Sequence, residues 1–97
     1  MGQEIKGKIA YITGAGSGIG KATVLQLAKE GVHVGLIGRT KSKLEQVAEE
    51  VKSNGVHVVV APADIAKMDE VNQAVEKLKQ ELGTADIGHN NLIVRMS

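Results

Sequence analysis

A glycine-rich segment near the N-terminus, KIAYITGAGSGIG at residues 8–20, constrains the fold more than any other part of the chain. A short apolar run, Ile9–Ile12, leads into four glycines within seven residues, and a helical pattern follows. Glycine has no Cβ, so the chain can turn sharply there and a ligand can approach the backbone closely. A helix that starts at such a turn directs unpaired N–H groups and the positive end of its dipole towards the ligand. The segment therefore predicts a diphosphate-binding site.

The spacing of these glycines separates the phosphate-binding motifs. A P-loop needs Ser or Thr directly after its Gly-Lys pair, but Ala22 stands in that position. The dinucleotide fingerprint G-x-G-x-x-G fails as well. Counting from Gly14 puts Ile19 in the position of the last glycine, and counting from Gly16 puts Lys21 there. The pattern that fits is T-G-x-x-x-G-x-G, at residues 13–20. The alternative is a glycine-rich structural turn that binds no ligand.

Strand-like and helical patterns alternate along the rest of the chain. Aliphatic runs predict strands, and apolar residues at i, i+3, i+4 and i+7 predict helices. The expected strands are residues 9–12, 32–37 and 56–61, and the expected helices are residues 19–30, 42–53 and about 71–82. Each helix runs into a glycine, at positions 31, 55 and 83, that suits a left-handed C′ residue. Strand–helix–strand units of this length imply a parallel sheet. We therefore expect one α/β domain, residues 1–97.

Composition narrows the classes of function. The chain has 97 residues, a formal net charge of +1 and no cysteine. Near-neutral charge gives no reason to expect nucleic acid or an anionic membrane as a partner, and no apolar run reaches the roughly 18 residues of a membrane span. His33 and His57 fall in different predicted strands, apart from one another, and His89 falls in the tail, so we expect no metal site. The cytoplasm is the default compartment.

The motif at residues 13–20, between a strand and a helix, resembles that of the short-chain dehydrogenase/reductase family. The resemblance covers about residues 5–87 and is of the 3-oxoacyl-(acyl-carrier-protein) reductase type. It implies a Rossmann-like three-layer half-fold with helices on both faces and strand order 3-2-1, or 3-2-1-4 where a fourth strand forms. It also implies a nicotinamide dinucleotide cofactor in contact with Gly14, Ser17, Gly18, Ile19 and Gly20. Ser17 has a second interpretation, as a helix-capping residue.

The residues after the second predicted strand favour NADP(H) as the cofactor. An NAD-specific site has an Asp or Glu near that point for the ribose 2′-hydroxyl, whereas this chain reads Gly38-Arg39-Thr40-Lys41. The Arg39 guanidinium offers a planar set of donors to a 2′-phosphate, with Thr40 and Lys41 beside it. Many NADP-dependent members of the family have a second basic residue inside the glycine turn, where this chain has Ser17. The alternative is a solvated basic turn before a helix.

The resemblance assigns three further contacts. Asp64, after the third strand, would accept a hydrogen bond from the adenine amine, and Ile65 would cover the ring. The alternative for Asp64 is a helix-entry aspartate without a ligand. Asn91 would contact the cofactor ribose.

The catalytic residues of the family, a Ser and a Tyr-x-x-x-Lys pair, have no counterpart in this chain. Tyr11 falls in the first predicted strand, and the residue four positions later is Ala15. We therefore assign no catalytic residue, and whether the chain is itself an enzyme stays open. The leading hypothesis is the NADP(H)-binding N-terminal portion of a carbonyl reductase, inactive alone. The alternatives are an oxidoreductase completed by another chain and a βαβ scaffold that self-associates without useful cofactor binding.

Residues 88–97 form a tail that departs from the family pattern. In the family sheet a fourth strand covers the far side of the first, and an uncovered edge at residues 9–12 would recruit another chain. Residues 92–96 are apolar enough to replace that strand, in their own molecule or in a neighbour. We therefore expect a homo-oligomer formed through this edge.

Overall fold

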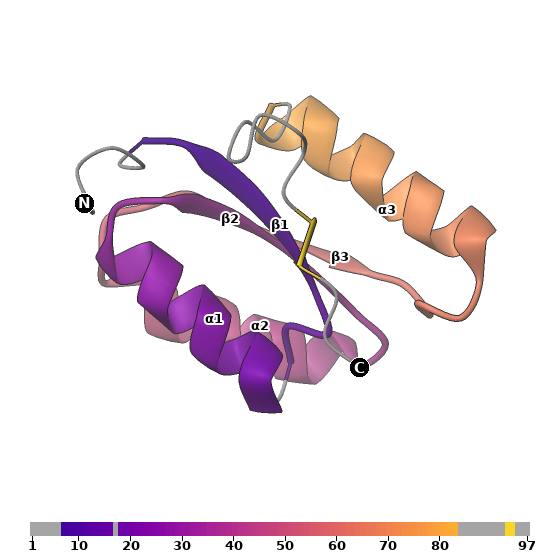
Figure 1. Ribbon diagram of the computed structural model, residues 1–97, viewed down its shortest axis with the longest axis horizontal. Coiled ribbons are helices and arrows are strands. Elements are labelled where there is room, and N and C mark those ends of the chain that lie inside the picture. The colour runs from indigo at the N-terminus through magenta and orange to yellow at the C-terminus, as the bar shows by residue number, and fades with distance from the viewer. Residues whose placement is uncertain (1–6, 17, 84–92, 95–97) are drawn as a thin grey trace.

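The computed structural model describes residues 7–16, 18–83 and 93–94, which form a parallel sheet flanked by helices (Figure 1). The elements in chain order are β1 (Ile9–Thr13), α1 (Gly18–Lys29), β2 (His33–Gly38), α2 (Lys41–Lys52), β3 (Val58–Pro62), α3 (Met68–Glu81) and β4 (Ile93–Val94). All neighbouring strands pair in parallel, and their order is β3-β2-β1-β4. The predicted α/β class and strand order are confirmed, and each boundary predicted for the three main strands lies within two residues of the observed one.

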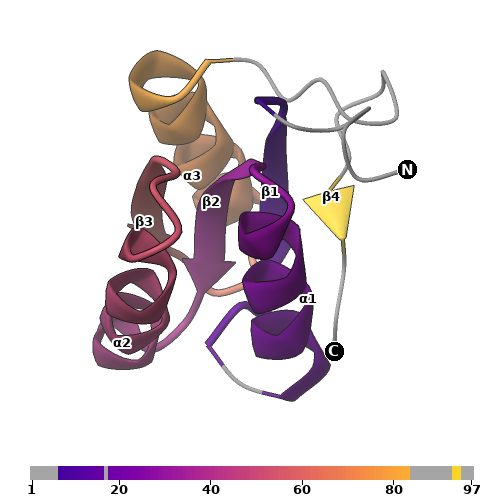
Figure 2. The same ribbon diagram turned by 90° about the vertical axis from the view of Figure 1, so that its left-hand side faces the viewer.

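The sheet has helices on both faces, with α1 and α2 on one side and α3 on the other (Figures 1 and 2). Successive strand residues point to opposite faces. In β1, Ala10 and Ile12 belong to the core under α1 and α2, whereas Tyr11 belongs to the core under α3. The strands β1, β2 and β3 each contribute to two separate cores, which explains why they read as continuous apolar runs.

A glycine follows each of the three helices, as predicted. Their φ angles are positive, at 85° for Gly31, 77° for Gly55 and 106° for Gly83. In each case the glycine N–H donates back to a carbonyl of the last helical turn, for example Gly31 to the Ala28 oxygen at 3.0 Å. These left-handed residues end the helices and direct the chain towards the next strand.

The one tyrosine of the chain has a structural role. Tyr11 is 1% exposed, and its hydroxyl donates a hydrogen bond to the carbonyl oxygen of Gly83. Because Gly83 follows α3, this bond joins the central strand to the end of the helix that covers it. The hydroxyl is thus committed to the fold and is not presented to a substrate.

The short strand β4 lies beside β1 in the same chain. Tyr11 is opposite Ile93 and Ile12 is opposite Val94. This is the first of the two arrangements expected for residues 92–96, a replacement strand within its own molecule. It pairs with two of the five residues of β1.

The structure corrects one expectation about the histidines. His33 and His57 do not lie apart, because His33 begins β2 and His57 directly precedes β3, the neighbouring strand, rather than lying within it. Their ring centroids are 4.9 Å apart, and the His57 backbone N–H donates to His33 Nδ1 at 2.9 Å. His89 is outside the described residues. Within the described ranges, no group of three or more His, Cys, Asp or Glu side chains could hold a metal ion. In the same ranges, no helix has the length and apolar character to cross a membrane.

Candidate functional site

The turns that follow β1, β2 and β3 lie together at the carboxyl edge of the sheet. The Ala15 N–H donates to the Ile37 carbonyl at 3.2 Å, which joins the glycine turn to the end of β2. The Ala63 N–H donates to the Gly38 carbonyl at 2.7 Å, which joins the end of β3 to the same strand. Ligands in open parallel sheets bind at this edge, so these three turns define the candidate site.

A pocket of about 200 Å³ opens between the glycine turn and the start of α2. It brings together three predicted site residues, Gly14, Arg39 and Thr40. Pockets for whole drug-sized ligands are larger, about 300–1,000 Å³, so this one matches part of a dinucleotide, such as a sugar with its phosphate. Four further residues line the pocket and were not predicted as site residues: Gly16, Gly38, Lys43 and Leu44.

The glycines of the turn allow close contacts or a left-handed backbone. A Cβ added at Gly20 would lie 2.0 Å from the Gly14 carbonyl oxygen, so the first turn of α1 packs directly on the loop. A Cβ added at Gly16 would lie 3.1 Å from Lys43 Cβ, so the loop also contacts α2. Gly14 and Gly18 have positive φ, at 68° and 59°. On this side the pocket is lined by Gly14 and Gly16, which have no side chains, just before the start of α1. The first N–H groups of a helix lack helical partners.

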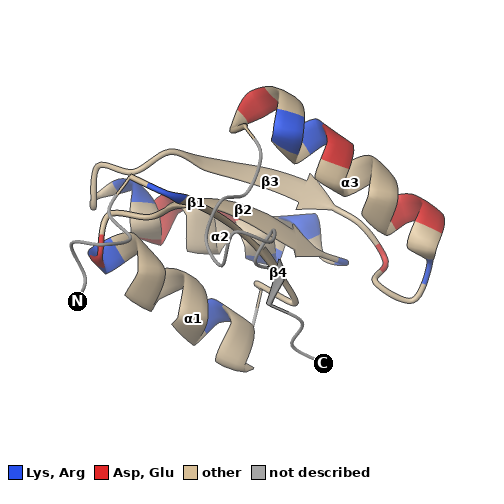
Figure 3. Ribbon diagram, turned by 45° about the horizontal axis from the view of Figure 1, so that its top comes forward, with Lys and Arg blue, Asp and Glu red and all other residues tan. Residues whose placement is uncertain are grey.

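Two of the three helices start without acidic residues. The first turns of α1 and α2 contain none, whereas the first turn of α3 contains Asp69 and Glu70. Figure 3 shows the contrast between α1 and α3. Thr40, the N-cap of α2, makes no side-chain capping bond. Because carboxylates normally stabilise helix N-termini, their absence leaves positive potential at the start of α2, which lines the pocket, and at the start of α1, which follows the glycine turn.

Three cationic side chains follow β2, and among the described residues only one of them forms an ion pair. Lys41 Nζ lies 3.9 Å from Glu45 Oε2, in an ion pair along α2. Arg39 and Lys43 line the pocket, and no carboxylate of the described residues forms an ion pair with either. The donor set, the bare glycine backbone and the uncompensated cations fit a phosphorylated ligand.

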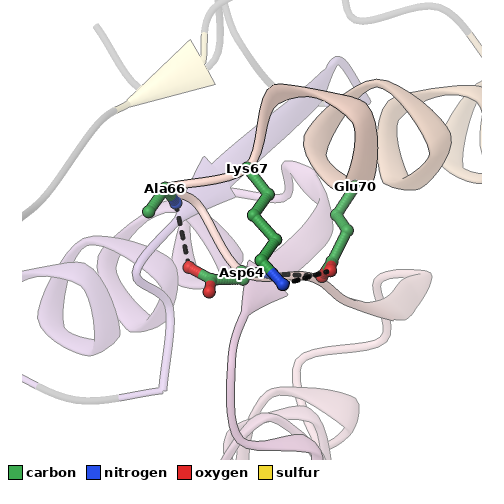
Figure 4. Close-up of polar contacts among 4 residues, drawn as sticks. All are labelled: Asp64, Ala66, Lys67 and Glu70. Atoms are coloured by element: carbon green, nitrogen blue, oxygen red, sulfur yellow. Dashed lines mark hydrogen bonds and ion pairs between the residues drawn. The ribbon is translucent and has the colours of Figure 1, made fainter.

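Asp64 and Ile65 lie in the loop between β3 and α3, outside the lining of this pocket. Asp64 Oδ1 accepts from the Ala66 N–H at 2.9 Å, and the Asp64 N–H donates to Glu70 Oε1 at 2.9 Å (Figure 4). Glu70 also forms an ion pair with Lys67 at 3.8 Å. This geometry matches the helix-entry interpretation of Asp64. An ionised carboxylate has further acceptor capacity, so a bond to a base amine stays a prediction.

The remaining predicted residues divide into two groups. Ile19, on the first turn of α1, is 69% exposed and Ile65 is 40% exposed, so both side chains are available to cover a ligand. Ser17 and Asn91 lie outside the described residues, and their contacts stay predictions.

Two of the lining residues that were not predicted differ in how far the sequence could have indicated them. Gly16 belonged to the glycine run, so its place in the pocket was foreseeable. Lys43 had no local signal, because its position depends on where α2 begins and on how closely that helix approaches the glycine turn.

Known proteins resemble this chain in sequence along most of its length. The model of the short chain dehydrogenase family matches residues 8–94, and so extends into the tail. The chain is 37% identical over 83 residues to 2,3-dihydro-2,3-dihydroxybenzoate dehydrogenase of Bacillus subtilis, covering 86% of this chain and 32% of that protein. It is 40% identical over 85 residues to a 3-oxoacyl-(acyl-carrier-protein) reductase of Staphylococcus epidermidis, covering 87% and 35%.

Solved structures resemble the fold closely. The L-sorbose reductase of Gluconobacter frateurii, complexed with NADPH and L-sorbose, has a TM-score of 0.83 and 38% identity over 89% of this chain and 33% of that one. A xylitol dehydrogenase with bound NAD+ has a TM-score of 0.81 and 31% identity over 86% and 32%. The chain thus spans about a third of the length of these relatives.

Proposed function

The chain belongs to the short chain dehydrogenase family, and we propose that it is the NADP(H)-binding N-terminal portion of an oxidoreductase. The parent reaction would be the NADPH-dependent reduction of a carbonyl group, for example in a 3-oxoacyl-(acyl-carrier-protein). A bound nicotinamide would supply the hydride for that reaction. The chain lacks the Ser and the Tyr-x-x-x-Lys pair that the family uses to activate the carbonyl, so we expect no turnover by this portion alone. We propose the cytoplasm as its compartment by default.

In this proposal the residues of the site hold separate parts of the cofactor. The backbone of the glycine turn and the start of α1 bind the diphosphate, with Ile19 over it. Arg39 and Thr40 bind the 2′-phosphate. Asp64 and Ile65 contact the adenine. Asn91 is proposed for the ribose, and Ser17 for a phosphate oxygen.

One observation carries the choice of NADP(H). Arg39 lines the pocket at the end of β2 without a carboxylate partner among the described residues, and no Asp or Glu lines that pocket. A carboxylate there would accept from a ribose 2′-hydroxyl and repel a 2′-phosphate. Relatives are solved with either cofactor, NADPH in the L-sorbose reductase and NAD+ in the xylitol dehydrogenase. The preference therefore depends on Arg39 rather than on family membership.

Calorimetric titration of the full chain with NADPH and NADH tests this proposal. We expect NADPH to bind at least about tenfold more tightly, because each charge-assisted contact to the 2′-phosphate contributes about that factor. Arg39→Gln should reduce the preference for NADPH by about tenfold. The matched control is Lys52→Gln, which removes the same charge from the far end of α2, where Lys52 pairs with Glu49 at 2.9 Å. Equal binding of both cofactors by the unmodified chain would contradict the NADP assignment, and no binding of either would favour the scaffold alternative.

A further inference from the structure

The first turn of α2 carries two lysines that make different contacts. Lys41 forms its ion pair with Glu45, at 3.9 Å along the same helix. Lys43 instead lines the pocket with Arg39, and neither of these cations has an ion pair with a described carboxylate. Both lysines are therefore exposed side chains of the first turn of α2 with the same charge. They differ in that Lys41 forms an ion pair with a neighbouring carboxylate.

The side chain of Lys43 begins directly against the glycine turn. A Cβ added at Gly16 would lie 3.1 Å from Lys43 Cβ, which is closer than most contacts between such carbons. Residues 14–18 contain no basic residue of their own. The approach of α2 therefore supplies, from a different element, the positive charge that the turn lacks.

This placement has a cost in the absence of a ligand. A cation in the first turn of a helix opposes the helix dipole, and two uncompensated cations around one pocket repel each other. A doubly charged phosphate bound between them removes both penalties and accepts charge-assisted hydrogen bonds from each.

We infer that Lys43 is the second recognition residue for the 2′-phosphate, acting with Arg39 across the pocket. The inference rests on the proposed function, because it assigns this pocket to the phosphorylated ribose. It gives Lys43 a role in discriminating between cofactors and gives Lys41 none.

The test compares Lys43→Met with its matched control Lys41→Met in the full chain. The two ligands are adenosine 2′,5′-bisphosphate and 5′-AMP, which differ by the 2′-phosphate alone, with affinities taken from nuclear magnetic resonance titrations. We expect Lys43→Met to weaken the bisphosphate about tenfold and AMP less than about twofold. Lys41→Met should change either ligand less than about twofold, and Lys43→Arg should restore most of the preference.

The outcomes separate this inference from the proposed function. If the unmodified chain prefers the bisphosphate and Lys43→Met keeps that preference, the role of Lys43 is overturned and the proposed function stands. If both methionine variants lose the same affinity, the effect is general electrostatics and the role of Lys43 is again overturned. If the unmodified chain does not distinguish the bisphosphate from AMP, the proposed function and this inference fail together. Both lysines are exposed, and circular dichroism of each variant checks that the fold is kept.

Discussion

Two glycines at the start of α1 are required for different physical reasons. Gly18 has φ of 59°, and an added Cβ would meet nothing within 4 Å, so the requirement there is conformational. A Cβ on Gly20 would lie 2.0 Å from the Gly14 carbonyl oxygen, a backbone atom that cannot move without opening the turn. The first glycine permits the turn, and the second permits the close contact between α1 and the turn.

This difference predicts unequal costs of alanine at the two positions. Gly18→Ala should lower the free energy of unfolding by about 1 to 2 kcal/mol, the cost of a left-handed non-glycine residue. Gly20→Ala should cost about 3 kcal/mol or more, because overpacking against backbone is not relieved by a rotamer change. Urea denaturation of both variants measures the difference. Equal costs would mean that α1 does not pack on the turn as described.

At the level of elements, the spacing between α3 and the sheet depends on a glycine within β2. A Cβ added at Gly35 would lie 2.7 Å from Leu78 Cδ1 and 2.9 Å from Cδ2, and Leu78 is fully buried. The helix therefore packs on bare backbone at this point of the strand. The same close approach keeps Tyr11 within hydrogen-bonding reach of Gly83.

A double-mutant cycle tests this contact. Gly35→Ala should destabilise the chain by about 1 to 3 kcal/mol, and Leu78→Val, which removes the clashing Cδ atoms, by about 1 kcal/mol. Together they should cost less than the sum by about 1 kcal/mol, because valine makes room for the new methyl group. Gly35→Ala combined with Val51→Ala, in the core on the other face, should be additive within about 0.5 kcal/mol. Additivity in the first cycle would contradict the described packing.

At the scale of the whole molecule, the edge of β1 that faces β4 determines whether the chain can associate with a second copy. The Lys8 carbonyl accepts from the His33 N–H, and successive residues direct their peptide groups to opposite edges of a strand. The peptide groups of Ile9 therefore point towards the β4 side of β1. Ile9 is not one of the two β1 residues, Tyr11 and Ile12, that pair with β4. We propose that this edge pairs with a second copy of the chain, as exposed edges tend to do.

Sedimentation velocity over a concentration series measures that association. The full chain should form dimers or larger species at about 100 µM. Ile9→Pro removes a donor from the β4 side alone, a position where proline is tolerated, and should shift the chain towards monomer. A monomeric unmodified chain at that concentration would show that β4 suffices to cover the edge.

Much of this arrangement was predictable from the sequence, because the controlling signals are local. Aliphatic runs and helical stripes predicted the elements, and the family resemblance predicted strand order. Features that depend on neighbouring strands and helices were not predictable from local pattern. Such features include the tilted contact between the His33 and His57 rings, the hydrogen bond from the Tyr11 hydroxyl to the end of α3, and the approach of Lys43 to the glycine turn.

The most direct test of the account follows the backbone amides of the isotopically labelled chain during titration with NADPH. We expect saturable shifts at Gly14, Gly16, Gly18 and Gly20, with further shifts at Arg39 and Lys43, because we propose that the diphosphate binds at the start of α1 and the 2′-phosphate at the start of α2. NADH should shift the glycine amides and leave those of Arg39 and Lys43 nearly unchanged. Shifts confined to another face of the sheet, or none at millimolar NADPH, would contradict the assignment of this site.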